Sequence, residues 1–177
     1  MQQTSRISTI GILGLLGLIA LLSGCAGPIT REALVPDSFN TKIKHTQSVS
    51  VSVSGSETAK SRISDETFAE ALLDSINKSQ VFSKAIQGKG GEYLLEVTLI
   101  SVERPMVATS VTIKMEAAWS LRRADTGAVV WQESIKSSHT ATMSDAMVGA
   151  TRWKMAEEGT AKNNIKAGLD KISTLNF

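Results

Sequence analysis

The chain has 177 residues, with 19 lysine and arginine residues against 17 aspartate and glutamate residues, and its formal net charge is +2. So small a charge predicts no general attraction to nucleic acid. Aromatic residues make up 5% of the chain, which leaves few platforms on which bases could stack. The chain has one cysteine, so no disulfide can form within it.

The first residues have the pattern of a secretory signal segment. Arg6 is the only charged residue before a nearly continuous apolar run from Ile10 to Leu22. This run is shorter than the roughly 20 apolar residues that cross a bilayer, and it fits the central region of a signal peptide. We therefore expect residues 1–24 to be a signal peptide that is removed.

The apolar run ends in Leu22, Ser23, Gly24 and Cys25. This ending resembles the lipobox, the cleavage motif of bacterial lipoproteins. The resemblance implies that a diacylglycerol is attached to the thiol of Cys25, that a peptidase cuts before this residue, and that a further acyl chain such as palmitate is added to the new amine. Several acyl chains are needed because one chain alone holds a membrane only marginally. The alternative is a buried structural cysteine in an uncleaved anchor.

The residue after the cysteine bears on localisation. It is Ala26, whereas an aspartate at this position favours retention at the inner membrane in the sorting pattern of these lipoproteins. The resemblance therefore implies a lipid anchor on the periplasmic face of the outer membrane, if the host has two membranes. The part that follows the signal peptide is long enough for one domain and a tether.

The stretch after the cysteine has no sustained hydrophobic period, and Pro28 and Pro36 interrupt it. We interpret residues 25–47 as the lipidated cysteine and a linker, which would reach roughly 70 Å if fully extended. The alternative is that Ile29 to Phe39 packs along the surface of the domain. Residues 48–177 are expected to form that domain.

The domain begins with valine and serine in strict alternation over residues 48–54, which predicts a strand with one buried face. Ser64 is a candidate N-cap of a helix that ends near Gln80. Val81 and Phe82 are expected to close the edge of the core. The helix has one apolar stripe, formed by Phe68, Leu72 and Ile76.

Three more strands are predicted downstream. A glycine-rich turn at residues 88–91 leads to a strand that ends at Pro105, and residues 111–121 alternate clearly. Residues 125–127 supply the turn of a hairpin. In the last strand Glu133 interrupts the apolar face, so we expect that strand to leave the core before Ile135 or to carry a bulge. The second strand has one apolar face formed by Tyr93, Leu95, Val97 and Leu99.

The rest of the chain is predicted to be helical from about Ser144, which can cap it. Gly159 lies where charged residues interrupt the apolar stripe, so we expect a kink or two helices there. The stripe itself consists of Ala161, Ile165, Leu169 and Ile172, with Met147 and Ala150 on the same side upstream.

The predicted order is therefore strand, helix, strand, strand, strand, helix. Single-residue alternation indicates a sheet with one buried face, which two helices can cover. We predict an α/β (α+β) fold, a two-layer sandwich with a mostly antiparallel sheet of about four strands.

No residues have the spacing of a catalytic, cofactor or metal site. His45 and His139 lie outside any metal-ligand spacing and are interpreted as solvated. The lysine in residues 88–91 is not followed by serine or threonine, and a strand follows, so this is a flexible turn rather than a phosphate loop. Glu157 and Glu158 are adjacent and are interpreted as a solvated patch. We therefore expect that the protein is not an enzyme and that it binds neither a cofactor nor a metal ion.

Three surfaces are candidates for binding a partner. One is the loop that contains Met106 and Val107, and another is the stretch from Met143 to Trp153, which includes Met147. An open edge strand also offers β-augmentation. The third surface is the polar face of the sheet, with Ser50, Ser52, Thr112, Lys114, Glu116 and Gln132. The alternative for the loop and for the stretch is that they pack in the core, and the alternative for the polar face is that it is simply solvated.

The layout resembles a group of periplasmic lipoproteins that pair a lipobox with a small β-α-β-β-β-α domain. The group includes the auxiliary lipoproteins of ABC-type transporters, the lipoprotein of lipopolysaccharide assembly, and the activators of penicillin-binding proteins. The likeness lies in residues 68–82, 92–97 and 119–131. It implies a non-catalytic accessory subunit that binds an envelope protein. The alternatives are an enzyme with an unrecognised site and a binder of lipid or glycan in an apolar groove.

Overall fold

The computed structural model describes residues 26–104 and 109–177. The predictions for the signal peptide and for Met106 and Val107 concern residues outside these ranges. Within the described ranges, no helix is both long enough and apolar enough to cross a membrane. The predictions for the cleavage motif also lie outside, at Leu22, Ser23, Gly24 and Cys25.

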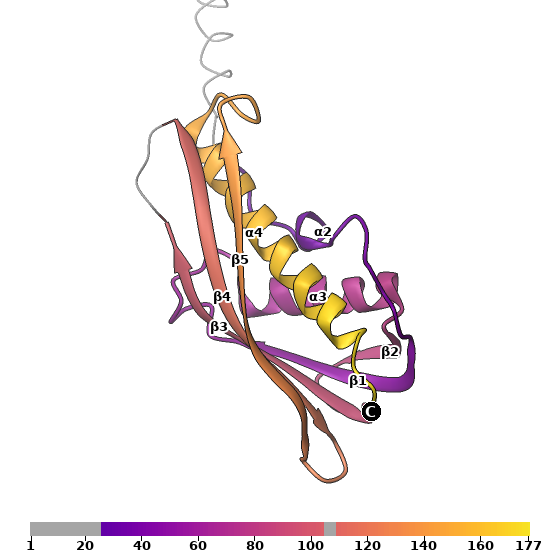
Figure 1. Ribbon diagram of the computed structural model, residues 1–177. Coiled ribbons are helices and arrows are strands. Elements are labelled where there is room, and N and C mark those ends of the chain that lie inside the picture. The colour runs from indigo at the N-terminus through magenta and orange to yellow at the C-terminus, as the bar shows by residue number, and fades with distance from the viewer. Residues whose placement is uncertain (1–25, 105–108) are drawn as a thin grey trace, which may run out of the picture.

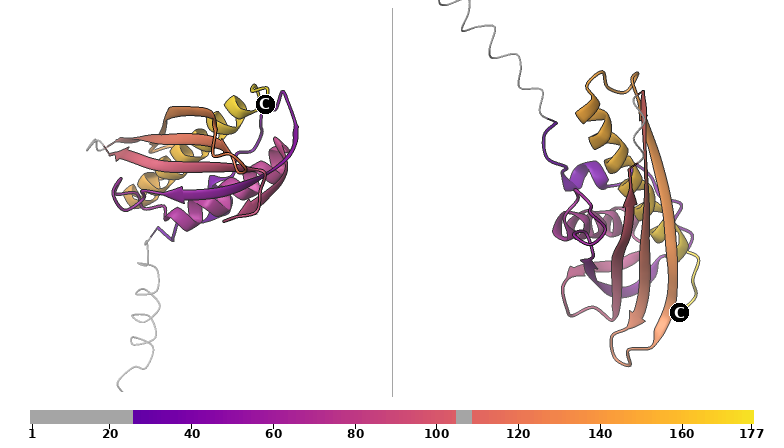
Figure 2. Two further views of the ribbon diagram at one scale, coloured as in Figure 1. Left: turned by 90° about the horizontal axis from the view of Figure 1, so that it is seen from below. Right: turned by 90° about the vertical axis from the view of Figure 1, so that its left-hand side faces the viewer.

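In the part of the chain that the structure describes, five strands form one sheet in the order β2-β1-β3-β4-β5. In Figure 1 the helices lie to the right of β3, β4 and β5, and in the right-hand view of Figure 2 α2 and α3 lie to one side of the strands. This confirms the α/β two-layer sandwich. The elements are α2 (Arg31–Leu34), β1 (His45–Ser54), α3 (Asp65–Ser79), β2 (Phe82–Gln87), β3 (Tyr93–Glu103), β4 (Ser110–Arg123), β5 (Val129–Thr142) and α4 (Gly149–Ile172).

The strand that the sequence did not predict is β2. It pairs in parallel with β1, which also pairs in parallel with β3, so only β3, β4 and β5 are antiparallel. Val81 and Phe82 are buried as expected, but the other residues of β2 do not alternate. A short edge strand has little area to bury, and its pairing with β1 rather than its sequence defines it.

The glycine-rich segment is not simply a turn, because it carries the chain from β2 across β1 to β3. The backbone N–H of Gly91 donates to Ser50 Oγ at 2.7 Å. A Cβ on Gly91 would collide with the backbone of Ser50, so only glycine allows this crossing. The crossing buries Ser50, which is therefore not part of an accessible polar face.

The core lies between the sheet and α3 and α4, and the alternating residues of β3 and β4 fill it. Trp119 in β4 is fully buried, and its indole N–H donates to Asn164 Oδ1 of α4 at 3.0 Å. The amide of Asn164 donates in turn to Ile135 O of β5 at 2.9 Å. This chain of hydrogen bonds fixes α4 across β4 and β5.

The course of β5 follows one of the two predicted alternatives. Ile135 is buried, so the strand does not leave the core before it, but β5 does carry a bulge. Glu133 is tolerated on this face because it reaches Lys171 of α4, with Lys171 Nζ 3.2 Å from Glu133 Oε1. The bulge lies next to the hairpin, where Val130 of β5 is the extra residue between the partners of Leu121 and Arg122.

Most of the expected linker packs on the domain, which was the alternative to a free linker. Leu34 is fully buried, and Ile29 and Phe39 pack against the same core. Ile43 N donates to Ser173 O at 2.9 Å, and β1 begins at His45. The segment shows no period because α2 has only four residues and the rest is irregular.

The expected kink in α4 is absent, because α4 is one uninterrupted helix from Gly149 to Ile172. Val148 is the N-cap residue, and Ser144 instead hydrogen-bonds Thr142 Oγ1 at 2.6 Å. A Cβ on Gly159 would collide with the ring of His139, so this glycine permits close packing against β5.

Candidate functional site: the open face of the sheet

One face of the sheet is left uncovered by the helices of the described chain (Figure 1). Most of its side chains are polar or charged and are exposed or half-buried, with Leu94 and Ala118 as apolar members, which is common in antiparallel sheets with one solvated face. We call this surface the open sheet face. Its polar and charged members include Ser52, Ser54, Glu96, Thr98, Ser101, Glu103, Thr112, Lys114, Glu116, Gln132, Ser134, Lys136, Ser138 and Thr140.

Neighbouring strands are joined on this face by polar pairs. The hydroxyls of Thr112 and Thr140 are 2.8 Å apart across β4 and β5. Glu116 accepts a hydrogen bond from Ser134 Oγ at 2.6 Å, and its other oxygen lies 3.7 Å from Lys136 Nζ. Such cross-strand pairs hold the side chains in a defined arrangement rather than leaving each one free.

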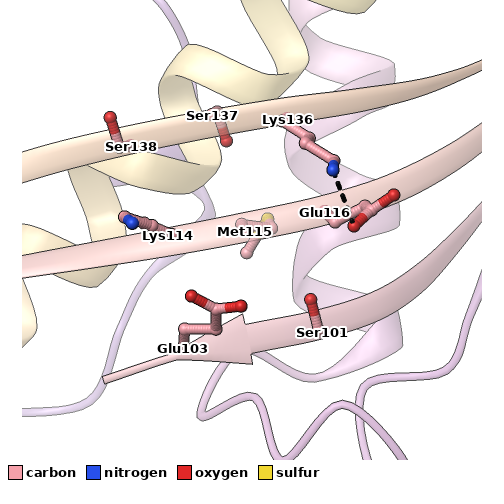
Figure 3. Close-up of a pocket in the computed structure, with 8 residues that line it drawn as sticks. All are labelled: Ser101, Glu103, Lys114, Met115, Glu116, Lys136, Ser137 and Ser138. Carbon is pink, nitrogen blue, oxygen red and sulfur yellow. Dashed lines mark ion pairs between the residues drawn. The ribbon is translucent and has the colours of Figure 1, made fainter. Parts of the chain in front are cut away.

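A shallow hollow of about 380 Å³ lies in the middle of the open sheet face (Figure 3). A bulge in β3 between Leu99 and Ser101 accompanies it, because the extra residue breaks the ladder to β4 at this level. Figure 3 shows the side chains that line it on three adjacent strands. They are Ser101, Glu103, Lys114, Met115, Glu116, Lys136, Ser137 and Ser138.

The charges in the hollow alternate from strand to strand. Glu103 of β3 is the register partner of Lys114 of β4, and Glu116 of β4 is the register partner of Lys136 of β5. Two carboxylates and two ammonium groups therefore form a pattern of alternating sign. Such a pattern can recognise a surface with the complementary order of charges, and it offers no single sign of charge to steer an ion.

The apolar candidates lie elsewhere, at the end of β5. Met143 and Met147 are exposed together with Val148, in the loop that leads to α4. Trp153 is half-buried and packs against the small cluster of Val111, Ile113, Ala141 and Ala156. The two methionines are therefore exposed in one loop, whereas Trp153 packs against this cluster, and none of the three residues lines the hollow.

The interpretation of the two adjacent glutamates as a solvated patch is wrong. Glu157 is fully buried, and its Oε1 lies 2.9 Å from Arg104 Nη2 and accepts a hydrogen bond from Arg62 N at 2.8 Å. Glu158 is half-buried, and burial raises its pKa, while Lys154 Nζ at 3.7 Å partly opposes this rise. These contacts connect segments that are distant in sequence, so no local pattern could reveal them.

The two histidines differ in their surroundings. His139 is exposed, as expected, whereas His45 is buried. The ring of His45 stacks on Phe177, with centroids 4.1 Å apart, and its Nε2 lies 3.2 Å from Ile172 O. The interpretation of His45 as solvated is therefore wrong, because the end of the chain folds back over it.

The hairpin between β4 and β5 holds an acid with a strongly shifted pKa. Hydrogen bonds from the Arg123 guanidinium, at 3.1 and 2.8 Å, lower the pKa of Asp125 from 3.8 to about 2. This pair therefore favours the folded hairpin above about pH 4, and the contribution is lost as the pH falls toward 2.

We expect the carboxyl carbon of Asp125 to titrate with a midpoint near 2 in NMR spectra. In Arg123→Gln the midpoint should rise toward 3.8, because the charged donor is gone. An unchanged midpoint in this variant would show that Arg123 does not set the pKa.

No family model and no curated protein sequence matches the chain. Several solved structures are similar. A protein of the DUF330 family from Xanthomonas campestris has 10% identity over 77% of this chain and 90% of its own, with a TM-score of 0.55. The PelC dodecamer from Paraburkholderia phytofirmans has 12% identity over 77% and 93%, with a TM-score of 0.51.

A minor lipoprotein from Acinetobacter baumannii has 11% identity over 77% of this chain and 94% of its own, with a TM-score of 0.52. Identities this low show a common fold and nothing finer. The chain therefore has an α/β sandwich fold that is also found in bacterial lipoproteins.

Proposed function

We propose that this protein is a bacterial lipoprotein, anchored by lipid on Cys25 to the periplasmic face of the outer membrane. Its domain serves as a non-catalytic accessory subunit that binds another envelope protein through the open sheet face. The observation that carries this proposal is the arrangement of that face, with a bulge, cross-strand pairs and charges of alternating sign.

A protein partner suits this surface better than a small molecule does. The hollow is shallow, and it lies among the side chains of three strands rather than between two layers (Figure 3). Pockets for small ligands are concave and mostly apolar, with few polar groups. Alternating charges on a broad face instead give specificity and register between two proteins.

The alternative of a lipid or glycan binder requires an apolar groove between sheet and helices. The structure fills this space with fully buried side chains, which argues against such a groove within the described residues. They include Phe68, Leu72, Ile76, Leu95, Trp119, Leu121 and Ile165.

Photocrosslinking in intact cells tests the proposal. A crosslinking amino acid is placed at Lys114 in the hollow and, as a matched control, at Asn77, which is exposed on α3. We expect a defined envelope protein to be captured from position 114 and not from position 77. Equal capture from both positions, or none from 114, would contradict the proposed surface.

Charge reversal in the hollow provides a second test. In Lys114→Glu a third carboxylate joins Glu103 and Glu116. We expect capture of the partner to fall about tenfold, which corresponds to a loss of about 1.4 kcal/mol in the free energy of binding. Lys89→Glu makes the same change of charge in the exposed segment over β1 and should leave capture unchanged. Quantitative mass spectrometry of the captured protein measures both.

A further inference from the structure

The packing of the N-terminal segment makes the membrane tether short. Ile29 already contacts the core, and α2 begins at Arg31. Six residues lead from Cys25 to Arg31, and they span about 20 Å at most. If Cys25 carries the lipid, as proposed above, the domain lies against the bilayer and not roughly 70 Å from it.

One end of the domain exposes apolar side chains. Within the described residues five large apolar side chains are exposed, and three of them lie in the loop between β5 and α4. Met143 is 48% exposed, Met147 80% and Val148 50%. We call these three residues the apolar tip. Exposed apolar side chains gathered in one loop of a folded domain are a candidate surface for a partner or a membrane.

The loop is held in a conformation that keeps these side chains outside the core. Arg152 Nη1 donates to the carbonyl oxygens of Ala146 and Met147 at 2.8 and 2.9 Å. Asp145, the one charged residue of the loop, accepts hydrogen bonds from the N–H and hydroxyl of Thr142, both at 2.7 Å. The carboxylate is thus directed to the loop's own backbone.

The N-cap residue of α4 is not of a type that stabilises a helix. Val148 is the N-cap of α4 and makes no side-chain hydrogen bond there. Serine, threonine, aspartate or asparagine at this position stabilises a helix, and valine does not. An exposed valine that breaks a local rule indicates a role other than folding.

The apolar tip lies at the end of the molecule where the described chain begins. Asp37, just after α2, is 3.4 Å from Lys162 of α4, and Ala33 borders a hollow with Met155. From Met155 the helix rises about 10 Å to Val148. A tether of about 20 Å covers this distance, so a bilayer at Cys25 can reach the tip.

The figures agree with this placement. In Figure 1 and in the right-hand view of Figure 2, the indigo start of the chain and the loop between β5 and α4 lie toward the upper end of the molecule. The hairpin between β4 and β5 lies at the opposite end in both views. The long strands β4 and β5 connect the two ends.

We propose that the apolar tip inserts into the interfacial layer of the lipid bilayer to which Cys25 is anchored. The inference rests on the proposed anchoring. Two attachments, the lipid and the tip, then fix the orientation of the domain, with β4 and β5 running away from the membrane and the open sheet face turned sideways to the periplasm. Flexible methionine side chains suit insertion among acyl chains.

A fluorescent label tests the insertion in the complete lipidated protein. Lipidation uses the thiol of the only native cysteine, so Met147→Cys supplies a single free thiol. Thr126→Cys, in the hairpin between β4 and β5, is the matched control, and the 14 residues of β5 separate the two positions by about 45 Å. Each protein carries an environment-sensitive dye and is reconstituted into vesicles of phosphatidylethanolamine and phosphatidylglycerol, with or without a nitroxide on the acyl chains.

We expect the acyl-chain nitroxide to lower the emission at position 147 about twofold or more, because an interfacial side chain lies about 5–10 Å deep, and to leave position 126 unchanged. Aqueous iodide should quench only position 126. Flotation of the unlabelled protein with the vesicles tests the anchoring separately.

Floating protein in which position 147 is open to iodide and not reached by the nitroxide overturns the insertion and leaves the anchoring intact. Shielding of position 147 from both quenchers means that protein covers the tip, and this also overturns the insertion. Protein that does not float overturns both proposals.

Discussion

Replacing Gly168 with alanine is expected to lower the free energy of unfolding by about 2 kcal/mol. A Cβ at this position would lie 2.5 and 2.6 Å from ring carbons of Trp119. The ring cannot move aside easily, because Trp119 is fully buried and its N–H is bound to Asn164. The clash outweighs the gain of about 1 kcal/mol in helix propensity. Urea denaturation measures the change.

Gly159→Ala is the matched control within the same helix. Its Cβ would meet the ring of His139, but that ring is exposed and can rotate away. The gain in helix propensity, about 1 kcal/mol, is then largely offset by the movement, and we expect a net change near zero. Equal destabilisation by both alanines would show that the mobility of the neighbouring side chain does not decide the outcome.

Arg104→Ala is expected to have the second large effect, a loss of about 3 kcal/mol in the free energy of unfolding. Glu157 is fully buried, and without the guanidinium the donors that its carboxylate keeps among the described residues are the backbone N–H of Arg62 and a distant hydroxyl of Ser61 at 3.5 Å. The burial of an uncompensated charge, rather than the lost attraction, causes most of the cost.

Glu157→Gln distinguishes these causes. Adding it to Arg104→Ala removes the buried charge and keeps an acceptor for Arg62 N. We expect the double variant to be more stable than Arg104→Ala alone, by about 1 kcal/mol or more. A double variant that is less stable than the single one would contradict this explanation.

Alternation along single strands was the most informative signal in the sequence. Residues 111–121 alternate except at Ala118. The structure buries the apolar set from Met115 to Leu121 in the main core, and Val111 and Ile113 in a smaller cluster with Ala156 of α4. The helix over Asp65–Ser79 was equally clear, and Ser64 Oγ accepts from Thr67 N as a cap should. Both features depend on neighbours in sequence, which a single chain displays directly.

The features that were missed depend on contacts that are distant in sequence. The edge strand β2 is defined by pairing with β1, and Leu34 is buried through contacts that the short helix α2 makes with α3 and α4. The pair of Glu157 and Arg104 joins residues 53 positions apart. From the sequence alone, adjacent glutamates on a helix are expected to be solvated, because the buried cation that pairs with one of them is not a sequence neighbour.

The candidate site was predicted in part. Thr112, Lys114 and Glu116 lie on the open sheet face as the alternation predicts. Ser50 does not, because the crossing segment at Gly91 covers it. The bulge at Ser101 and the charge order across three strands come from strand register, which the sequence does not display.

The mass of the intact protein, purified from the membranes of its native host, tests the lipid anchor most directly. The account predicts a chain of residues 25–177 that is heavier than its amino acids by a diacylglycerol and an acyl chain, with all added mass on the peptide that contains Cys25. A product that still begins at Met1, or a free thiol at position 25, would contradict it.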